Sequence, residues 1–326
     1  MVNIRDVVAS NARFARAQHE GSVCVFAGAT SGIGNSTMPR LATMMQSSTF
    51  YILGRSEARF VSQMDELRVS APTNKFVFVD CQLSLIRDVD AASKRILSAE
   101  KMVDYLCMSP GGMPFQGAVY TEEEGLDVHF VVSYYARARL LSNLLPLLHQ
   151  SPQPRVLSIL NGTKEKRINE QEIGLQKNWG IVSLVSHSTI CTSLAFDYLS
   201  AAETPAPHTV LIHATPGLVH TRVQRTRRPS IKKVGILWWA LTSAFQIVSG
   251  WIIVCFGRSL EEAGERHAFL LTTDTIGPGS WRTNRNIDVV PDNEALRYYH
   301  ERGFAETVWN HTVQVWETAL GRSSSS

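Results

Sequence analysis

A glycine-rich turn near the start of the chain sets the kind of fold to expect. Gly28, Gly32 and Gly34 follow an apolar, β-branched run at 22–26 and precede a helical pattern at 36–45. Glycine lets a turn tighten and lets backbone N–H groups approach a phosphate closely. The amino end of the following helix adds partial positive charge. The spacing therefore predicts a phosphate-binding junction between a strand and a helix.

Strand and helix patterns alternate along most of the chain. Beyond the glycine turn, runs typical of strands occur at 49–53, 75–79, 104–108, 155–160, 209–213 and around 281–287. Helical patterns lie between them at 59–69, 84–99, 123–148 and 181–201, with Ser84 as a candidate N-cap. Such alternation predicts an α/β fold, a doubly wound parallel (Rossmann-type) sheet with helices on both faces. We expect residues 1–326 to form one domain.

The composition limits which binding partners and which cellular compartment we expect for the protein. The 326 residues carry a formal net charge of only +3, which gives no argument for binding nucleic acid. Five cysteines, at 24, 81, 107, 191 and 255, lack the C-x-x-C spacing of metal sites. We expect reduced core cysteines, no metal and a cytoplasmic location. Residues 1–20 lack the apolar stretch of a signal peptide and predict a short helix.

The glycine turn resembles the T-G-x-x-x-G-I-G signature of the short-chain dehydrogenases/reductases, with Ala27 in place of the threonine. The resemblance spans roughly residues 3–288 and is greatest to divergent fungal members, which often accompany natural-product pathways. It leaves a C-terminal helical extension at 291–322. It implies a nicotinamide dinucleotide cofactor held at the turn. The implied contacts there are Gly28, Thr30, Ser31, Gly32, Ile33 and Gly34.

The end of the second strand indicates which nicotinamide cofactor is used. A carboxylate at this position would hydrogen-bond the ribose 2′-hydroxyl of NAD. The chain instead has Arg55 there. A guanidinium can form a bidentate pair with a 2′-phosphate. We therefore expect NADP(H), while an exposed loop arginine is the alternative interpretation of Arg55.

The resemblance implies further cofactor contacts after later strands. Residues 81–85 match the family's C-D-L-S-L adenine contact, with Gln82 in place of aspartate. Residues 108–111 stand where the family has N-N-A-G and keep only the glycine, and 215–221 match P-G-x-x-x-T. The implied contacts are Gln82, Leu83, Ser109, Pro110, Gly111, Pro216, Gly217 and Thr221.

The family's catalytic residues are the ones this chain lacks. The family uses Asn, Ser, Tyr and Lys, and its Y-x-x-x-K sequence occurs nowhere in this chain. Counting back from Ser193 places Gly180 at the tyrosine position and Leu184 at the lysine position. The serine position falls on Asn161 and the asparagine position on Ser133. Because glycine and leucine cannot titrate, carbonyl reduction through a Tyr–Lys pair is excluded.

Another group would have to replace the missing proton donor, whose loss typically costs ~10²–10⁴-fold in rate. The candidates for a catalytic role are Asn161, Ser133, Arg137 on the same helical face as Ser133, and Glu165 in the charged run that follows the fifth strand. Asn161 could donate a hydrogen bond to an oxyanion but could not give up a proton. Lys164, Lys166 and His187 are further candidates. Each has a structural alternative: a solvated loop for 164–167, an ion pair for Arg137, and a helix contact for His187.

The stretch 234–256 contains no charged residue and follows a cluster of arginines and lysines. Its length would span a bilayer, but its position between two strands of one sheet argues against spanning. We expect a hydrophobic lid insertion within 218–258. The lid either lines an apolar substrate pocket or dips into a membrane interface as a peripheral contact.

Three functions remain open from sequence. The favoured one is an NADP(H)-dependent oxidoreductase of the short-chain dehydrogenase type with a non-standard site. It would act on an apolar small molecule, as in natural-product tailoring. The alternatives are a non-redox cyclase or isomerase derived from the same fold, and a catalytically silent NADP-binding protein. Family members dimerise through two central helices, so a homodimer is expected unless the extension blocks it.

Overall fold

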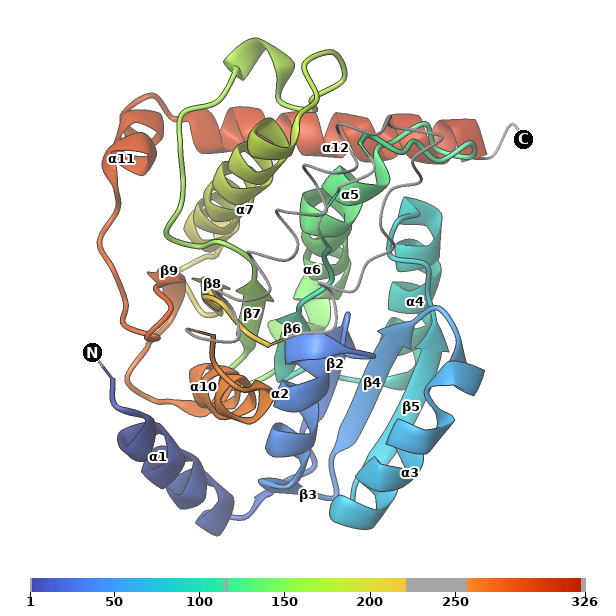
Figure 1. Ribbon diagram of the computed structural model, residues 1–326, viewed down its shortest axis with the longest axis vertical. Coiled ribbons are helices and arrows are strands. Elements are labelled where there is room, and N and C mark those ends of the chain that lie inside the picture. Colours follow the sequence, from blue (N-terminus) through green and yellow to red (C-terminus); the bar gives the residue numbers. More distant parts are fainter. Residues whose placement is uncertain (1, 113, 115–116, 221–256, 324–326) are drawn as a thin grey trace, which may run out of the picture.

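The computed structural model describes residues 2–112, 114, 117–220 and 257–323 (Figure 1). The expected lid at 234–256, Thr221 and Cys255 lie outside the described residues. The four other cysteines are buried and unpaired, as expected.

A seven-stranded sheet with the order β5-β4-β2-β6-β7-β8-β9 forms the centre of the described structure, and every neighbouring pair is parallel. The strands are β2 Val23–Ala27, β4 Thr49–Gly54, β5 Lys75–Asp80, β6 Tyr105–Met108, β7 Arg155–Ile159, β8 Val210–Ala214 and β9 Gly279–Thr283. A separate short pair joins β1 His19–Glu20 to β3 Met45–Gln46. The doubly wound sheet is confirmed, although its last strand ends at Thr283 and not near 287.

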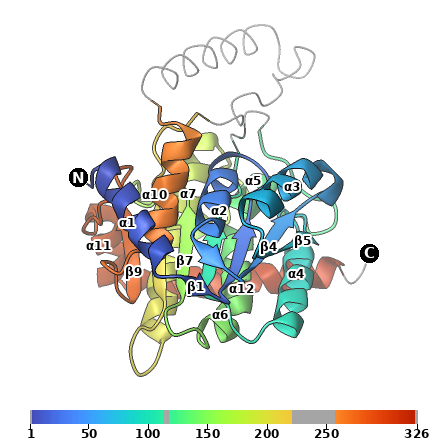
Figure 2. The same ribbon diagram turned by 90° about the horizontal axis from the view of Figure 1, so that it is seen from below.

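Helices cover both faces of the sheet (Figure 2). One face carries α1 Ile4–Arg16, α2 Gly32–Ala42, α3 Val61–Ser70 and α10 Leu260–Thr272. The other carries α4 Ile86–Ala99, α6 Ala136–Leu148 and α7 Ile181–Ala202. Each face of the sheet has its own hydrophobic core, and alternate residues of β2 point into one or the other. Cys24 and Phe26 pack on the first face, whereas Val25 packs on the second. Since both faces are covered, the strands are apolar runs without polar alternation.

The C-terminal extension is helical and packs back on the domain, as predicted. It consists of α11 Glu294–Glu301 and α12 Phe304–Ser323. Helix α12 lies across the ends of α7 and α4 (Figure 1). Asn293 caps α11, because its side-chain oxygen accepts the N–H of Leu296 at 3.0 Å.

Two helix starts differ from prediction, and each is capped by a carboxylate: Glu124 for α4 and Asp127 for α5 (Val128–Phe130). Helix α4 begins at Ile86, and the Ser84 N-cap is wrong. The buried Glu124 instead accepts the backbone N–H groups of Ile86 at 2.8 Å and of Arg87 at 3.0 Å. Glu124 therefore lies in a capping loop, and the helix predicted from 123 begins only with α5 Val128–Phe130.

A π-helical turn, Val131–Tyr135, joins α5 to α6, and α12 binds it directly. The Tyr134 and Tyr135 hydroxyls lie 2.6 Å from Thr312 Oγ1 and 2.9 Å from His311 Nε2. Trp316 Nε1 donates to the carbonyl oxygen of Tyr135 at 3.2 Å. The extension therefore supports the irregular turn that carries Ser133.

Candidate cofactor cleft and active site

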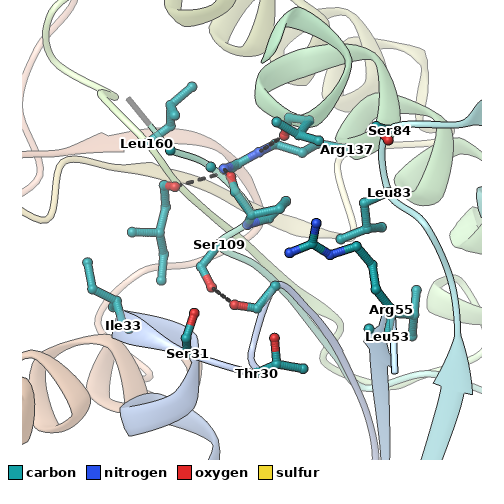
Figure 3. A pocket seen from close by; sticks show the side chains of 18 of the residues that line it. Thr30, Ser31, Ile33, Leu53, Arg55, Leu83, Ser84, Ser109, Arg137 and Leu160 are labelled. Carbon is teal, nitrogen blue, oxygen red and sulfur yellow. Dashed lines mark hydrogen bonds between the residues drawn. The ribbon is translucent and has the colours of Figure 1, made fainter. Parts of the chain in front are cut away.

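A cavity of about 460 Å³ lies at the carboxyl ends of β2, β4, β6 and β7 (Figure 3). Open parallel sheets bind ligands at such ends, next to the point where the strand order reverses. Here that point lies between β2 and β6. Most of the predicted cofactor contacts line the cavity: Gly28, Thr30, Ser31, Gly32, Ile33, Arg55, Leu83, Ser109, Pro110, Gly111 and Pro216.

The glycine turn is built for close backbone approach. Gly28 has φ +79° and Gly32 has φ +66°, values that L side chains rarely adopt. Gly34 is not among the lining residues. A Cβ there would lie 2.3 Å from Ser109 Oγ, so a glycine at this position makes room for the Ser109 side chain. The Ser109 hydroxyl donates to the Gly28 carbonyl at 3.1 Å. The turn and the loop after β6 therefore form one packed wall, with the start of α2 directed at the cavity.

Arg55 follows the last residue of β4 and is exposed. Its guanidinium is turned into the cavity beside Leu83 (Figure 3). It makes no hydrogen bond or ion pair with any described residue. A free cation at the end of this strand can accept an anionic group from a bound molecule.

Like Gly34, two further predicted contacts are not among the lining residues, and a third falls outside the described part of the chain. Gln82 is exposed, its backbone N–H donates to Asp88 at 3.2 Å, and it is not among the lining residues. Gly217 makes the turn after Pro216 with φ +74°. Thr221 lies outside the described residues.

Arg137 lines the cavity and is only 2% exposed. The structure does not pair it with a carboxylate: all its described partners are neutral oxygens. They are the carbonyls of Val132 at 3.1 Å, Met108 at 3.1 Å and Ile159 at 3.0 Å, the Pro110 carbonyl, and Ser158 Oγ at 2.8 Å. Burial lowers the pKa of Arg137 to about 9, so the side chain is charged at neutral pH. The guanidinium N–H groups of Arg137 therefore hold the ends of β6 and β7 together.

Asn161 and Glu165 belong to a buried hydrogen-bond chain. The Asn161 N–H donates to His213 Nε2 at 3.3 Å, which assigns the imidazole proton to Nδ1. His213 Nδ1 then donates to Ser193 Oγ at 2.8 Å, and the Ser193 hydroxyl donates to Glu165 Oε1 at 2.7 Å. Asn293 Nδ2 donates to Glu165 Oε2 at 3.2 Å. The Glu165 carboxylate therefore holds the loop after β7 in place through these hydrogen bonds.

Burial shifts the pKa values of two groups in this hydrogen-bond network. It raises the pKa of Glu165, opposed by the hydrogen bond from Ser193, and it lowers the pKa of His213 so that the imidazole is neutral. Sequence reasoning missed His213, Ser193 as a partner, and Gly162. A Cβ on Gly162 would lie 1.8 Å from the His213 carbonyl oxygen, so the loop requires glycine. The glycine directly after Asn161 was the available signal.

The positions that replace the Tyr–Lys pair carry no acid–base group. Gly180 is the N-cap residue of α7, and Leu184 is 3% exposed. His187 Nδ1 lies 3.0 Å from the carbonyl oxygen of Ile173, which makes it a buried helix contact. Ser133 is half-buried on the π-helical turn, and neither it nor Asn161 is among the lining residues.

His129, one turn before Ser133, lines the cavity and was missed from sequence. Burial lowers its pKa, opposed by the Asp127 carboxylate. No group of three or more His, Cys, Asp or Glu side chains in the described part of the chain could hold a metal. No described helix has the length and apolarity to cross a membrane.

Comparisons with known proteins agree with this geometry. No family model matches the chain. It is 33% identical over 350 residues to "Oxidoreductase AN1596" of Emericella nidulans, which covers 99% of this chain and 100% of that protein. It is 32% identical over 329 residues to "Short-chain dehydrogenase/reductase SAT2" of Stachybotrys chartarum, covering 91% and 92%. Its fold is similar to that of L-sorbose reductase from Gluconobacter frateurii, solved with NADPH and L-sorbose, at TM-score 0.57 and 17% identity, covering 85% and 99%.

Proposed function

Because this chain belongs to the short-chain dehydrogenase/reductase superfamily, we propose that it is an NADP(H)-dependent oxidoreductase. Its substrate is an apolar small molecule, and its role is natural-product tailoring. The observation that carries the proposal is the cavity in which the glycine turn and Arg55 face each other.

The choice of cofactor rests on Arg55. Its guanidinium is free among the described residues and reaches the cavity from the end of β4. A 2′-phosphate supplies the dianion that such a group binds, whereas the 2′-hydroxyl of NAD does not. The backbone N–H groups at the start of α2 would hold the pyrophosphate.

The substrate class rests on apolar lining and on sequence. Ile33, Val132, Leu160 and Pro216 contribute apolar groups to the cavity wall. The uncharged stretch 234–256 supports a hydrophobic lid from its sequence alone. The natural-product role rests on the resemblance of the sequence to divergent fungal members of the superfamily.

The bound cofactor would supply a hydride from its nicotinamide ring. The chain's own residues orient the reactants: the loop after β7 is fixed by the His213–Ser193–Glu165 hydrogen bonds. Asn161 does not line the cavity, and its side-chain amide cannot release a proton. The proton must therefore come from a replacement group or from the substrate itself.

Titration with NADPH and NADH tests the cofactor assignment. We expect NADPH to bind more tightly and Arg55→Ala to lose about tenfold or more of that affinity, with NADH affinity unchanged. Arg59, exposed on the next turn, gives a control variant, Arg59→Ala. Equal affinity of the wild-type protein for both cofactors would remove Arg55 from this role.

A non-redox cyclase or isomerase is the second candidate, favoured by Gly180 and Leu184 at the positions of the missing pair. Stoichiometric NADPH oxidation with product supports the oxidoreductase. Product formation without an absorbance change at the nicotinamide band supports the cyclase or isomerase. Binding of NADPH without turnover of any substrate indicates a silent NADP-binding protein.

A further inference from the structure

Arg137 brings an unbalanced positive charge to the cavity wall. Its side chain is 2% exposed, and its hydrogen bonds go to carbonyl and hydroxyl oxygens only. No salt bridge joins it to a described carboxylate. Carbonyl oxygens satisfy the donors of a buried guanidinium but supply only partial charges. A full positive charge therefore remains on a side chain that has almost no contact with solvent.

The strand order places this charge at one particular half of the cavity. Arg137 binds the carbonyl oxygens of Met108 and Ile159, the last residues of β6 and β7. Arg55 lies on the other side of the strand-order reversal, at the end of β4. Figure 3 shows the Arg55 side chain turned into the cavity and the Arg137 side chain at a different part of the cavity wall.

A dinucleotide that crosses such a reversal places its two halves on opposite sides. If Arg55 binds the 2′-phosphate of the adenosine half, the nicotinamide half lies over β6 and β7, beside Arg137. This step rests on the proposed function.

We propose that the charge of Arg137 makes the site bind the reduced cofactor more tightly than the oxidised one. The two forms differ chiefly at the nicotinamide ring, which carries a positive charge when oxidised and none when reduced. A fixed cation beside the ring repels only the oxidised form. The residue would thereby favour uptake of the reduced cofactor and release of the oxidised one, without touching the substrate.

The expected size follows from Coulomb's law. Two unit charges about 10 Å apart, at an effective dielectric constant of about 20, change an equilibrium constant by roughly tenfold. An effect of Arg137 on the phosphates would act equally on both forms. The ratio of the two dissociation constants therefore isolates the interaction with the ring.

Arg155 provides a matched control at the opposite end of β7. It is 8% exposed, and its guanidinium donates to the carbonyl oxygens of Leu270 at 3.4 Å and Ile276 at 2.7 Å. It is thus a buried arginine held by carbonyl groups, like Arg137, but it does not line the cavity. Arg155→Gln should perturb packing without altering the electrostatics of the cleft.

The test is calorimetric titration of NADPH and NADP⁺ into the wild-type protein and the Arg137→Gln, Arg137→Lys and Arg155→Gln variants. We expect the wild type to bind NADPH at least tenfold more tightly than NADP⁺. Arg137→Gln should reduce this ratio about tenfold, whereas Arg137→Lys and Arg155→Gln should keep it.

An unchanged ratio in folded Arg137→Gln, or an equal fall in Arg155→Gln, would overturn the inference. If Arg137→Gln does not fold, the ratio of the NADPH and NADP⁺ dissociation constants of the wild type still tests the proposal. Equal binding of the two forms, or tighter binding of NADP⁺, contradicts it. Failure of the wild type to bind either form would instead overturn the proposed function, and this inference with it.

Discussion

A Cβ atom on Gly28 would lie 2.4 Å from the backbone nitrogen of Pro110. The first β–α turn and the loop after β6 therefore touch through backbone, with no room for a side chain. This contact closes one wall of the cavity, and it depends on a glycine whose φ is +79°.

Gly28→Ala should therefore damage both stability and cofactor binding. The added methyl group meets backbone atoms, which cannot move aside cheaply. Gly21→Ala separates this clash from strain alone, because Gly21 has φ +71° but a Cβ there would meet no atom within 4 Å. We expect Gly21→Ala to cost about 1–2 kcal/mol in unfolding free energy and Gly28→Ala clearly more. Equal losses in urea denaturation would show that the contact with Pro110 is unimportant.

Gly162→Ala tests the loop that carries Asn161. Its Cβ would lie 1.8 Å from the His213 carbonyl oxygen, so the loop or β8 must shift. We expect a loss of about 3 kcal/mol, at the upper end for overpacking. Gly277→Ala, with nothing within 4 Å, should change the free energy of unfolding by less than about 1 kcal/mol. A Gly162→Ala protein as stable as the wild type would contradict the packing described.

His300 should make stability depend on pH. Its Nε2 lies 2.8 Å from Asp197 and its Nδ1 lies 3.1 Å from Asp292, and the hydrogen bond to Asp197 raises the pKa of His300. Arg282 also faces both carboxylates. Since the folded pKa is above the usual 6.5, this contribution is fully present below pH 6.5 and is lost as pH rises through the folded value.

The measurement is thermal unfolding at pH 6 and pH 8.5. The wild type should lose more stability over this interval than His300→Gln, by roughly 1 kcal/mol or less because the imidazole is partly exposed. Identical pH dependence of the two proteins would remove His300 from this role.

Trp316 tests whether the extension supports the active-site helix. It is 2% exposed and donates to the Tyr135 carbonyl in the π-helical turn. Trp316→Ala should cost about 3–5 kcal/mol, as for other buried aromatic residues. The half-buried Trp309 on the same helix gives a milder comparison, Trp309→Ala. If Trp316→Ala were no more damaging than Trp309→Ala in urea denaturation, α12 would not be anchored at this turn.

Local patterns were sufficient to predict the sheet and the glycine turn, and the family resemblance implied most of its cofactor contacts that line the cavity. Fully buried parallel strands are continuous apolar runs, and Gly28 and Gly32 occupy a left-handed conformation that favours glycine. These signals are contained within a few consecutive residues, so they can be found without a structure.

The features that sequence reasoning missed involve partners far apart in the chain. Glu124 caps α4 from a loop 38 positions away, in place of the predicted Ser84 cap. Arg137 is bonded to carbonyl oxygens, which no side-chain pattern reveals. The link between Asn161 and His213 joins two neighbouring strand ends and depends on sheet order.

The most direct test of the proposed cofactor site is to measure, by calorimetry, the equilibrium binding of NADPH to the purified wild-type protein. We predict saturable binding with one NADPH per chain and weaker binding of NADH, because the glycine turn would hold the pyrophosphate and Arg55 the 2′-phosphate. Absence of saturable binding by both nucleotides would contradict this assignment.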